Sequence, residues 1–129
     1  MNSRTCCLVN AICLLAGLAV FGLVACNRDP GPPAPLAVGQ IPAELQEAFD
    51  QARPEAKDIV GRITSALREQ DYPAAYEEVQ TLSTLPDETS QQREVGARAL
   101  LTLTGLLQSA QAQGDEKAAT ALRLRQMNR

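Results

Sequence analysis

The chain has 129 residues and, with 12 basic and 15 acidic side chains, a formal net charge of −3. A mildly acidic chain gives no reason to expect a nucleic-acid partner. It contains no histidine, which excludes Ser-His and Cys-His catalysis, histidine general bases and histidine metal ligands.

An apolar segment runs from Leu8 to Val24, after the basic Arg4, and only Asn10 interrupts it. Ala25 follows the segment, and Cys26 comes next. A basic start, an apolar stretch of roughly 7–15 residues and a small residue at the cleavage point are typical of a secretory signal peptide. The sequence therefore predicts a signal peptide over residues 1–25.

The stretch Leu23-Val24-Ala25-Cys26 resembles the lipobox of bacterial lipoproteins. The resemblance implies lipidation of the Cys26 sulfur, cleavage between Ala25 and Cys26, and acylation of the new N-terminus. A protein processed in this way is anchored to a membrane by several acyl chains, which together bind stably. In the enteric sorting rule, a residue other than aspartate after the cysteine, here Asn27, implies the outer membrane, with the protein facing the periplasm.

A membrane-spanning helix is the alternative interpretation of the same segment, because its length is close to the roughly 20 residues that cross a bilayer. Both interpretations place residues 27–129 outside the cytoplasmic membrane. Cys6, Cys7 and Cys13 lie in the predicted signal peptide and would be removed with it. The exported part is therefore predicted to have no disulfide and no free thiol.

Residues 27–40 read NRDPGPPAPLAVGQ, with four prolines and two glycines. This composition predicts an irregular tether over residues 26–40, and Pro-rich linkers extend by about 3.1 Å per residue. We interpret the tether as a plain spacer, and a ligand for a proline-binding domain is the alternative. The folded domain is predicted to occupy residues 41–129.

Apolar residues from Leu45 onward are spaced four and three apart, which predicts one buried stripe on a helical segment. Pro54 falls inside the segment, and proline removes a helical hydrogen bond. Because the stripe keeps its phase across Pro54, we expect a kinked or broken pair of helices over 42–52 and 54–70. The stripe consists of Leu45, Phe49, Ala52, Ala56, Ile59, Ile63 and Ala66.

Capping signals predict the next two helices. Asp71 is expected to cap a helix that ends near Pro86, with Pro73 tolerated in its first turn. Thr89 and Gln92 form the T-x-x-Q pattern of a capping box, which opens a long helix over 89–113. The buried side of the first of these helices is predicted to contain Tyr72, Tyr76, Val79 and Leu82.

The predicted long helix is apolar on two sides, and such a helix is either central to its domain or used for contact. One side carries Val95, Ala99, Leu103, Leu106 and Ala110, and the other carries Leu100, Leu101 and Leu107. The second group provides the candidate partner-binding residues. Burial of Leu100, Leu101 and Leu107 within the monomer is the alternative.

A weak internal repeat aligns ALREQDYPAA (66–75) with AQAQGDEKAA (110–119). In each copy an aspartate caps the helix that follows a tight turn, and Gly114 can end the long helix in the left-handed conformation. Asp115 then opens a last helix over 116–127, whose inward side is predicted to contain Ala118, Ala119 and Leu122. The DY-x-x-A turn resembles that of tetratricopeptide repeats, without the family's period of about 34 residues, its early tryptophan or its Leu-Gly pair. We predict an all-α domain of about four helices in antiparallel hairpins, tetratricopeptide-like in shape only, with a fifth segment before Pro54.

No catalytic residue, metal site or cofactor is predicted. The carboxylate pairs Glu44/Glu47, Glu55/Asp58 and Glu77/Glu78 are interpreted as solvated helix faces. The basic tail complements the dipole of the last helix, and contact with lipid headgroups or an acidic partner is the alternative. This tail contains Arg123, Arg125 and Arg129.

These features predict a non-enzymatic, membrane-anchored module of the bacterial cell envelope that binds an envelope protein or forms a homodimer. The alternative function is binding of a small apolar ligand or lipid in the periplasm, with the helix from Val95 to Leu107 lining the pocket. The chain resembles small bacterial lipoproteins with helical-repeat-like domains, several of which are accessory parts of envelope machines, such as the pilotins of secretins.

Overall fold

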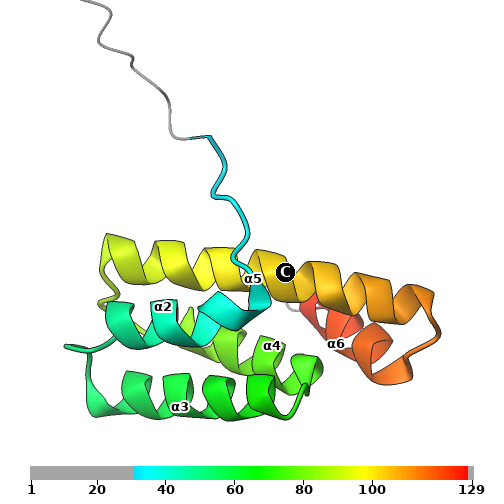
Figure 1. The fold of residues 1–129 in the computed structure, drawn as a ribbon, viewed down its shortest axis with the longest axis horizontal. Helices are drawn as coiled ribbons and strands as arrows, with labels where there is room; N and C mark the ends of the chain where they lie inside the picture. Colours follow the sequence, from blue (N-terminus) through cyan, green and yellow to red (C-terminus); the bar gives the residue numbers. More distant parts are fainter. Residues whose placement is uncertain (1–30, 128–129) are drawn as a thin grey trace, which may run out of the picture. The chain divides into compact units, whose positions relative to one another are not determined.

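The computed structural model describes residues 31–127, which contain five α-helices, one short 3₁₀ helix and no β-strand (Figure 1). The all-α prediction is therefore confirmed. The predicted signal peptide, the cleavage point at Ala25 and Cys26, and Arg129 lie outside the described residues. The elements are η1 (Val38–Gln40), α2 (Ile41–Ala48), α3 (Pro54–Arg68), α4 (Tyr72–Leu82), α5 (Ser90–Ala112) and α6 (Glu116–Met127).

The predicted break at Pro54 separates two helices. α2 ends at Ala48, and α3 begins with Pro54 at its first position, where the missing N–H has no intrahelical partner to lose. Arg53 is extended, with φ −60° and ψ 152°, as the residue before a proline prefers. The fifth segment expected before Pro54 is thus a helix of its own.

The two predicted aspartate caps are present. The Asp71 carboxylate accepts a hydrogen bond from the Ala74 amide over 3.1 Å at the start of α4. The Asp115 carboxylate accepts one from the Ala118 amide over 3.0 Å at the start of α6. Each cap satisfies an amide that the first helical turn leaves without a partner.

The turns before these caps also have the same backbone geometry. Gln70 and Gly114 are both left-handed, with φ of 58° and 92°. The amides of Asp71 and Asp115 each donate to the carbonyl five residues earlier, over 2.9 Å and 3.0 Å, which is the longer bond of a Schellman motif. The α3–α4 and α5–α6 turns therefore repeat one local structure, although only the second has glycine at the left-handed position.

One side of α5 lies at the centre of the core. Its buried residues Val95, Ala99, Leu103 and Leu107 are spaced four apart and form a single ridge along the helix. α5 packs against α2, α4, α6 and η1, so this ridge is covered by most of the domain. The largest fully buried side chains are Tyr76, Phe49, Ile41, Leu45, Ile63, Leu82, Leu103, Leu107 and Val79.

Two of the three glycines inside helices face open space. A Cβ added at Gly61 or Gly105 would meet no heavy atom within 4 Å. At Gly96 it would lie 3.7 Å from the Ser83 hydroxyl oxygen, where α4 packs against α5. Of these three glycines, Gly96 therefore lies at a contact between helices, and Gly61 and Gly105 do not.

None of the helices in the described part of the chain combines the length and the apolar composition needed to cross a membrane.

Gln92 joins the beginning of α5 to the end of α2. The side-chain oxygen of Gln92 accepts from the backbone amide of Thr89 over 2.8 Å, and the backbone amide of Gln92 donates to the Thr89 hydroxyl over 3.2 Å. These two bonds complete the predicted capping box. The side-chain nitrogen of Gln92 also donates to the Ala48 carbonyl over 3.1 Å. One buried amide thus satisfies polar groups at two helix ends.

We expect Gln92→Ala to lower the free energy of unfolding by about 2 kcal/mol, because it removes the side-chain acceptor of the Thr89 amide and leaves the Ala48 carbonyl without its donor. Urea denaturation of the domain measures this change. Gln91→Ala, at the exposed neighbouring position, is the matched control and should leave the midpoint unchanged. Equal losses in the two variants would contradict the role assigned to Gln92.

Candidate functional site

The three leucines predicted to bind a partner do not form one surface. Leu107 is fully buried, Leu100 is partly buried against the core, and Leu101 is 48% exposed. Because α5 is covered by several neighbours, its second apolar side also packs within the domain at Leu100 and Leu107. Leu107 is therefore a core residue rather than a candidate contact, and Leu101 is an isolated exposed leucine.

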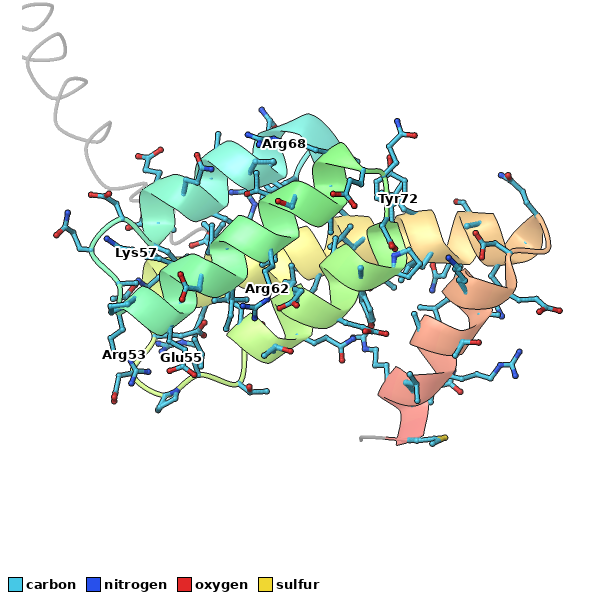
Figure 2. All side chains as sticks on the ribbon, turned by 90° about the horizontal axis from the view of Figure 1, so that it is seen from below. Arg53, Glu55, Lys57, Arg62, Arg68 and Tyr72 are labelled. Atoms are coloured by element: carbon cyan, nitrogen blue, oxygen red, sulfur yellow. The ribbon has the colours of Figure 1, made fainter. Side chains whose placement is uncertain are left out.

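The larger apolar exposure lies on α6. Leu124 is 45% exposed and Met127 is 77% exposed, and residues three apart share one face of a helix. Figure 2 shows the second half of α6 extending away from the other helices. The sequence interpretation placed Ala118, Ala119 and Leu122 inward and assigned no contact role to the apolar residues beyond them.

The extension of α6 follows from where its small residues lie. Ala75 on α4 and Ala118 on α6 are both fully buried, and alanine side chains let two helices approach closely. Farther along, a hollow of about 390 Å³ lies between the helices, and its walls include Thr81 from α4, Thr84 from the turn after α4, and Leu124 from α6. The close contact near the start of α6 thus gives way to an open edge near its end.

A second hollow, of about 250 Å³, lies on the other side of α6, against α5. Its walls include Arg123 and Arg125, two of the three arginines of the predicted basic tail. Nη1 of Arg125 donates to the Thr104 hydroxyl over 3.3 Å. The second half of α6 therefore presents two guanidinium groups toward the hollow beside α5, and it exposes the apolar side chains of Leu124 and Met127.

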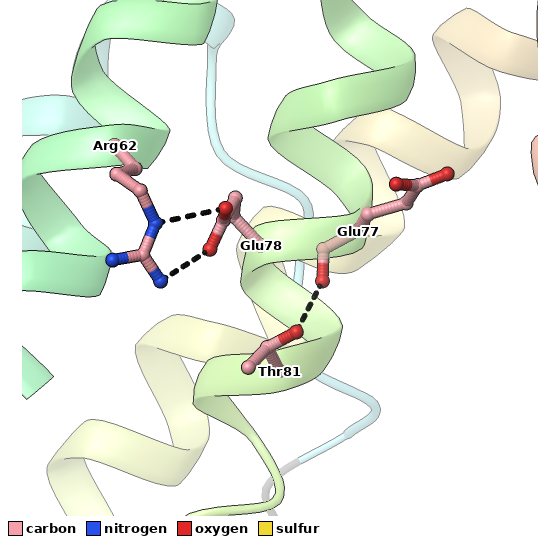
Figure 3. A network of polar contacts seen from close by, with 4 residues as sticks. All are labelled: Arg62, Glu77, Glu78 and Thr81. Atoms are coloured by element: carbon pink, nitrogen blue, oxygen red, sulfur yellow. Dashed lines mark hydrogen bonds and ion pairs between the residues drawn. The ribbon is translucent and has the colours of Figure 1, made fainter.

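The acidic pair Glu77/Glu78 is not a paired carboxylate site. Glu78 receives two hydrogen bonds of 2.9 Å from Arg62 on α3, while Glu77 points away from this pair (Figure 3). The pKa of Arg62 is raised chiefly by its hydrogen bond to Glu78. Both partners are partly solvated, and such surface pairs contribute little to stability.

Among residues 31–127, no group of three or more histidine, cysteine or acidic side chains lies close enough to hold a metal ion. The other predicted carboxylate pairs, Glu44/Glu47 and Glu55/Asp58, lie on α2 and α3, and three of these four side chains are exposed. The sites with the chemistry of molecular contact are therefore the two sides of α6.

The last residues of the predicted tether pack onto α5. The Ala34 carbonyl accepts from Nε of Arg98 over 2.9 Å, and the Leu36 carbonyl accepts from the Thr102 hydroxyl over 2.6 Å. The Leu36 side chain is 4% exposed and belongs to the core. Residues 38–40 form η1, so the expectation of an irregular structure up to residue 40 is wrong for the segment that meets the domain.

No protein-family model matches the sequence, and neither a curated protein nor a solved structure matches it.

We expect Thr102→Val to weaken the attachment of residues 34–40, because valine keeps the shape of threonine and loses the donor to Leu36. The predicted cost is about 1 kcal/mol of the free energy of unfolding, together with faster hydrogen exchange at the Gln40 amide, which donates to Ala37 within this segment. Thr120→Val is the control, since that hydroxyl bonds only within α6. Unchanged exchange at Gln40 in Thr102→Val would show that the segment is held by other contacts.

Proposed function

We propose that the protein is a lipoprotein of the bacterial cell envelope, anchored through lipid on Cys26, whose helical domain binds an envelope protein without catalysing a reaction. The anchor rests on the lipobox-like stretch that ends at Cys26. Asn27 after the cysteine favours the outer membrane, with the domain in the periplasm.

The exposed apolar edge of α6 is the observation that carries the binding role. Leu124 and Met127 leave apolar area in water beside an open hollow, and apolar area left in water is unfavourable by about 25 cal/mol per Å². Exposed apolar surface bordered by polar groups is typical of contact sites. Polar neighbours are present here, since Glu77 and Gln80 on α4 also line the hollow.

The alternative of a small apolar ligand has less support. The core positions of α5 are filled by neighbouring helices, so the buried residues of the helix from Val95 to Leu107 do not line a ligand pocket. The hollows beside α6 include charged side chains, Glu77 on one side and Arg123 and Arg125 on the other. Small-molecule sites are instead enclosed and mostly apolar.

The anchor is tested by labelling with radioactive palmitate and by membrane fractionation of the full-length chain and of Cys26→Ala. We expect label and membrane association for the wild type, and an unlabelled, unprocessed precursor for the variant, because the acyl chains attach at the Cys26 sulfur. Absence of label from both chains would contradict the lipid anchor and leave the apolar segment as an ordinary signal or a spanning helix.

The contact surface is tested in cells by placing a photo-crosslinking amino acid at Leu124. We expect a discrete adduct that persists after membrane purification and disappears when Met127→Asp is added, since burial of Met127 against the partner is the expected driving force. The probe at Gln46, an exposed position on α2, is the matched control. The same adducts from both positions, or none from Leu124, would contradict a partner at α6, and an adduct of twice the monomer mass would identify a homodimer.

A further inference from the structure

Charge is unevenly distributed along the domain. Residues 31–115 contain 13 acidic and six basic side chains, whereas α6 (Glu116–Met127) contains one acidic and three basic side chains. A negatively charged body repels acidic partners, so α6 is where an acidic group would meet an attractive potential.

The hollow between α5 and α6 is lined by basic and neutral polar groups, although most of the domain carries an excess of acidic residues. Its described lining residues include no carboxylate, and they present two guanidinium groups together with the side-chain amides of Gln108, Gln111 and Gln126. The larger hollow between α3 and α4, by contrast, is lined by four carboxylates as well as by Lys57 and Arg62, and Arg62 is paired with Glu78. The carboxylates are those of Asp58, Glu69, Asp71 and Glu78.

The α5 wall of this hollow is neutral because α5 carries no charged residue after Arg98. The stretch from Ala99 to Gly114 supplies leucines to the core and hydroxyl or amide groups to the surface. An anion in the hollow would therefore meet hydrogen-bond donors from α5 and positive charge from α6, with no carboxylate to compete for the arginines.

The two arginines of the hollow are available for a ligand. Among residues 31–127, neither Arg123 nor Arg125 is in an ion pair, and the ion pair that is present joins Arg62 to Glu78. The bond from Arg125 to the Thr104 hydroxyl uses one N–H of its guanidinium and holds that group beside α5. Guanidinium groups bind carboxylates through paired, charge-assisted hydrogen bonds.

We propose that the hollow between α5 and α6 binds an acidic segment of the protein partner, with carboxylates on Arg123 and Arg125. This inference rests on the proposed function and names the chemistry of the partner. Leu124, on the α4 side of α6, and the exposed Met127 near the end of the helix receive apolar side chains of the same partner. A segment in which acidic and apolar residues alternate in short groups fits both sides of the helix.

An anion site at the arginines near the end of α6 also explains two features that the helix dipole does not explain. Arginines in a last turn stabilise the C-terminal end of a helix wherever they point. The dipole does not require the facing helix to be free of charge, or Thr104 to hold one guanidinium at the edge of a hollow. Binding of an anion accounts for both.

The experiment measures the fluorescence anisotropy of the peptide Leu-Glu-Glu-Leu-Leu-Glu-Glu-Leu-amide, labelled with fluorescein at its N-terminus, with the mature lipidated protein in phosphatidylcholine nanodiscs. We expect Arg123→Gln/Arg125→Gln to weaken binding about tenfold or more, because two charge-assisted contacts are lost. The matched control is Lys57→Gln/Arg68→Gln on α3, which removes the same charge and should change affinity by less than about twofold. Circular dichroism melting curves verify that both variants fold.

Two results would overturn the inference. Equal weakening by both double variants would mean that the peptide responds to net charge rather than to the hollow. Failure of the wild type to bind the glutamate peptide more tightly than its glutamine counterpart would remove the acidic partner. The crosslinking experiment at Leu124 would still test the proposed function independently, because its outcome depends on the exposed apolar residues Leu124 and Met127.

A third arm distinguishes a lipid surface from a protein segment. If the arginines instead meet lipid phosphate, nanodiscs containing phosphatidylglycerol should abolish peptide binding in the wild type while protecting Arg123 and Arg125 from reaction with phenylglyoxal. That outcome would assign the hollow to the membrane surface and contradict the peptide proposal. Persistence of peptide binding on these nanodiscs supports it.

Discussion

The burial of one ridge of α5 is the interaction on which the rest of the structure depends. Val95, Ala99, Leu103 and Leu107 place a side chain in the core on successive turns, and α2, α4 and α6 pack around this helix. With no disulfide among the described residues, the domain depends on this packing and on satisfied helix ends for its stability. Gln92, at the start of the same helix, secures the junction with α2.

The candidate site is a consequence of how α6 leaves this core. Its first half is fixed by the Asp115 cap and by the buried Ala118, where small side chains allow a close approach to α4. Beyond Leu122 the packing residues give way to Leu124 and Met127, which have no helix to cover them fully. A helix fixed at one end and uncovered at the other provides a surface whose position is set by the core and whose side chains are free to bind.

Local chemistry made much of the fold predictable from the sequence. The caps at Asp71, Thr89 and Asp115 and the left-handed Gly114 involve residues within a few positions of one another, so their hydrogen bonds can be inferred from spacing alone. Pro54 likewise acts on its own turn. The helix boundaries that depend on these residues agree with the structure to within a few positions.

The errors concern contacts between segments far apart in the chain. Leu36 was assigned to a tether because its neighbours are prolines and glycines, yet its carbonyl is held by Thr102, 66 residues away. Leu107 is predicted to lie on a second, exposed face of the long helix. The periodicity of apolar residues shows which of them share a face, but not how many other helices cover that face. Leu124 and Met127 could have been suspected, since two apolar residues three apart remained outside the predicted inward set of α6.

The middle of α5 contacts both the segment that leads toward Cys26 and the second half of α6, the two parts to which the proposals assign a role. Arg98 and Thr102 bind the carbonyls of the segment that leads to Cys26, and Thr104 binds Arg125 of α6. These contacts fall within two turns of one uninterrupted helix, and a continuous helix transmits position with little bending. A partner held on α6 would therefore keep a fixed position relative to the point where the chain leaves the described domain toward Cys26, the proposed site of the anchor.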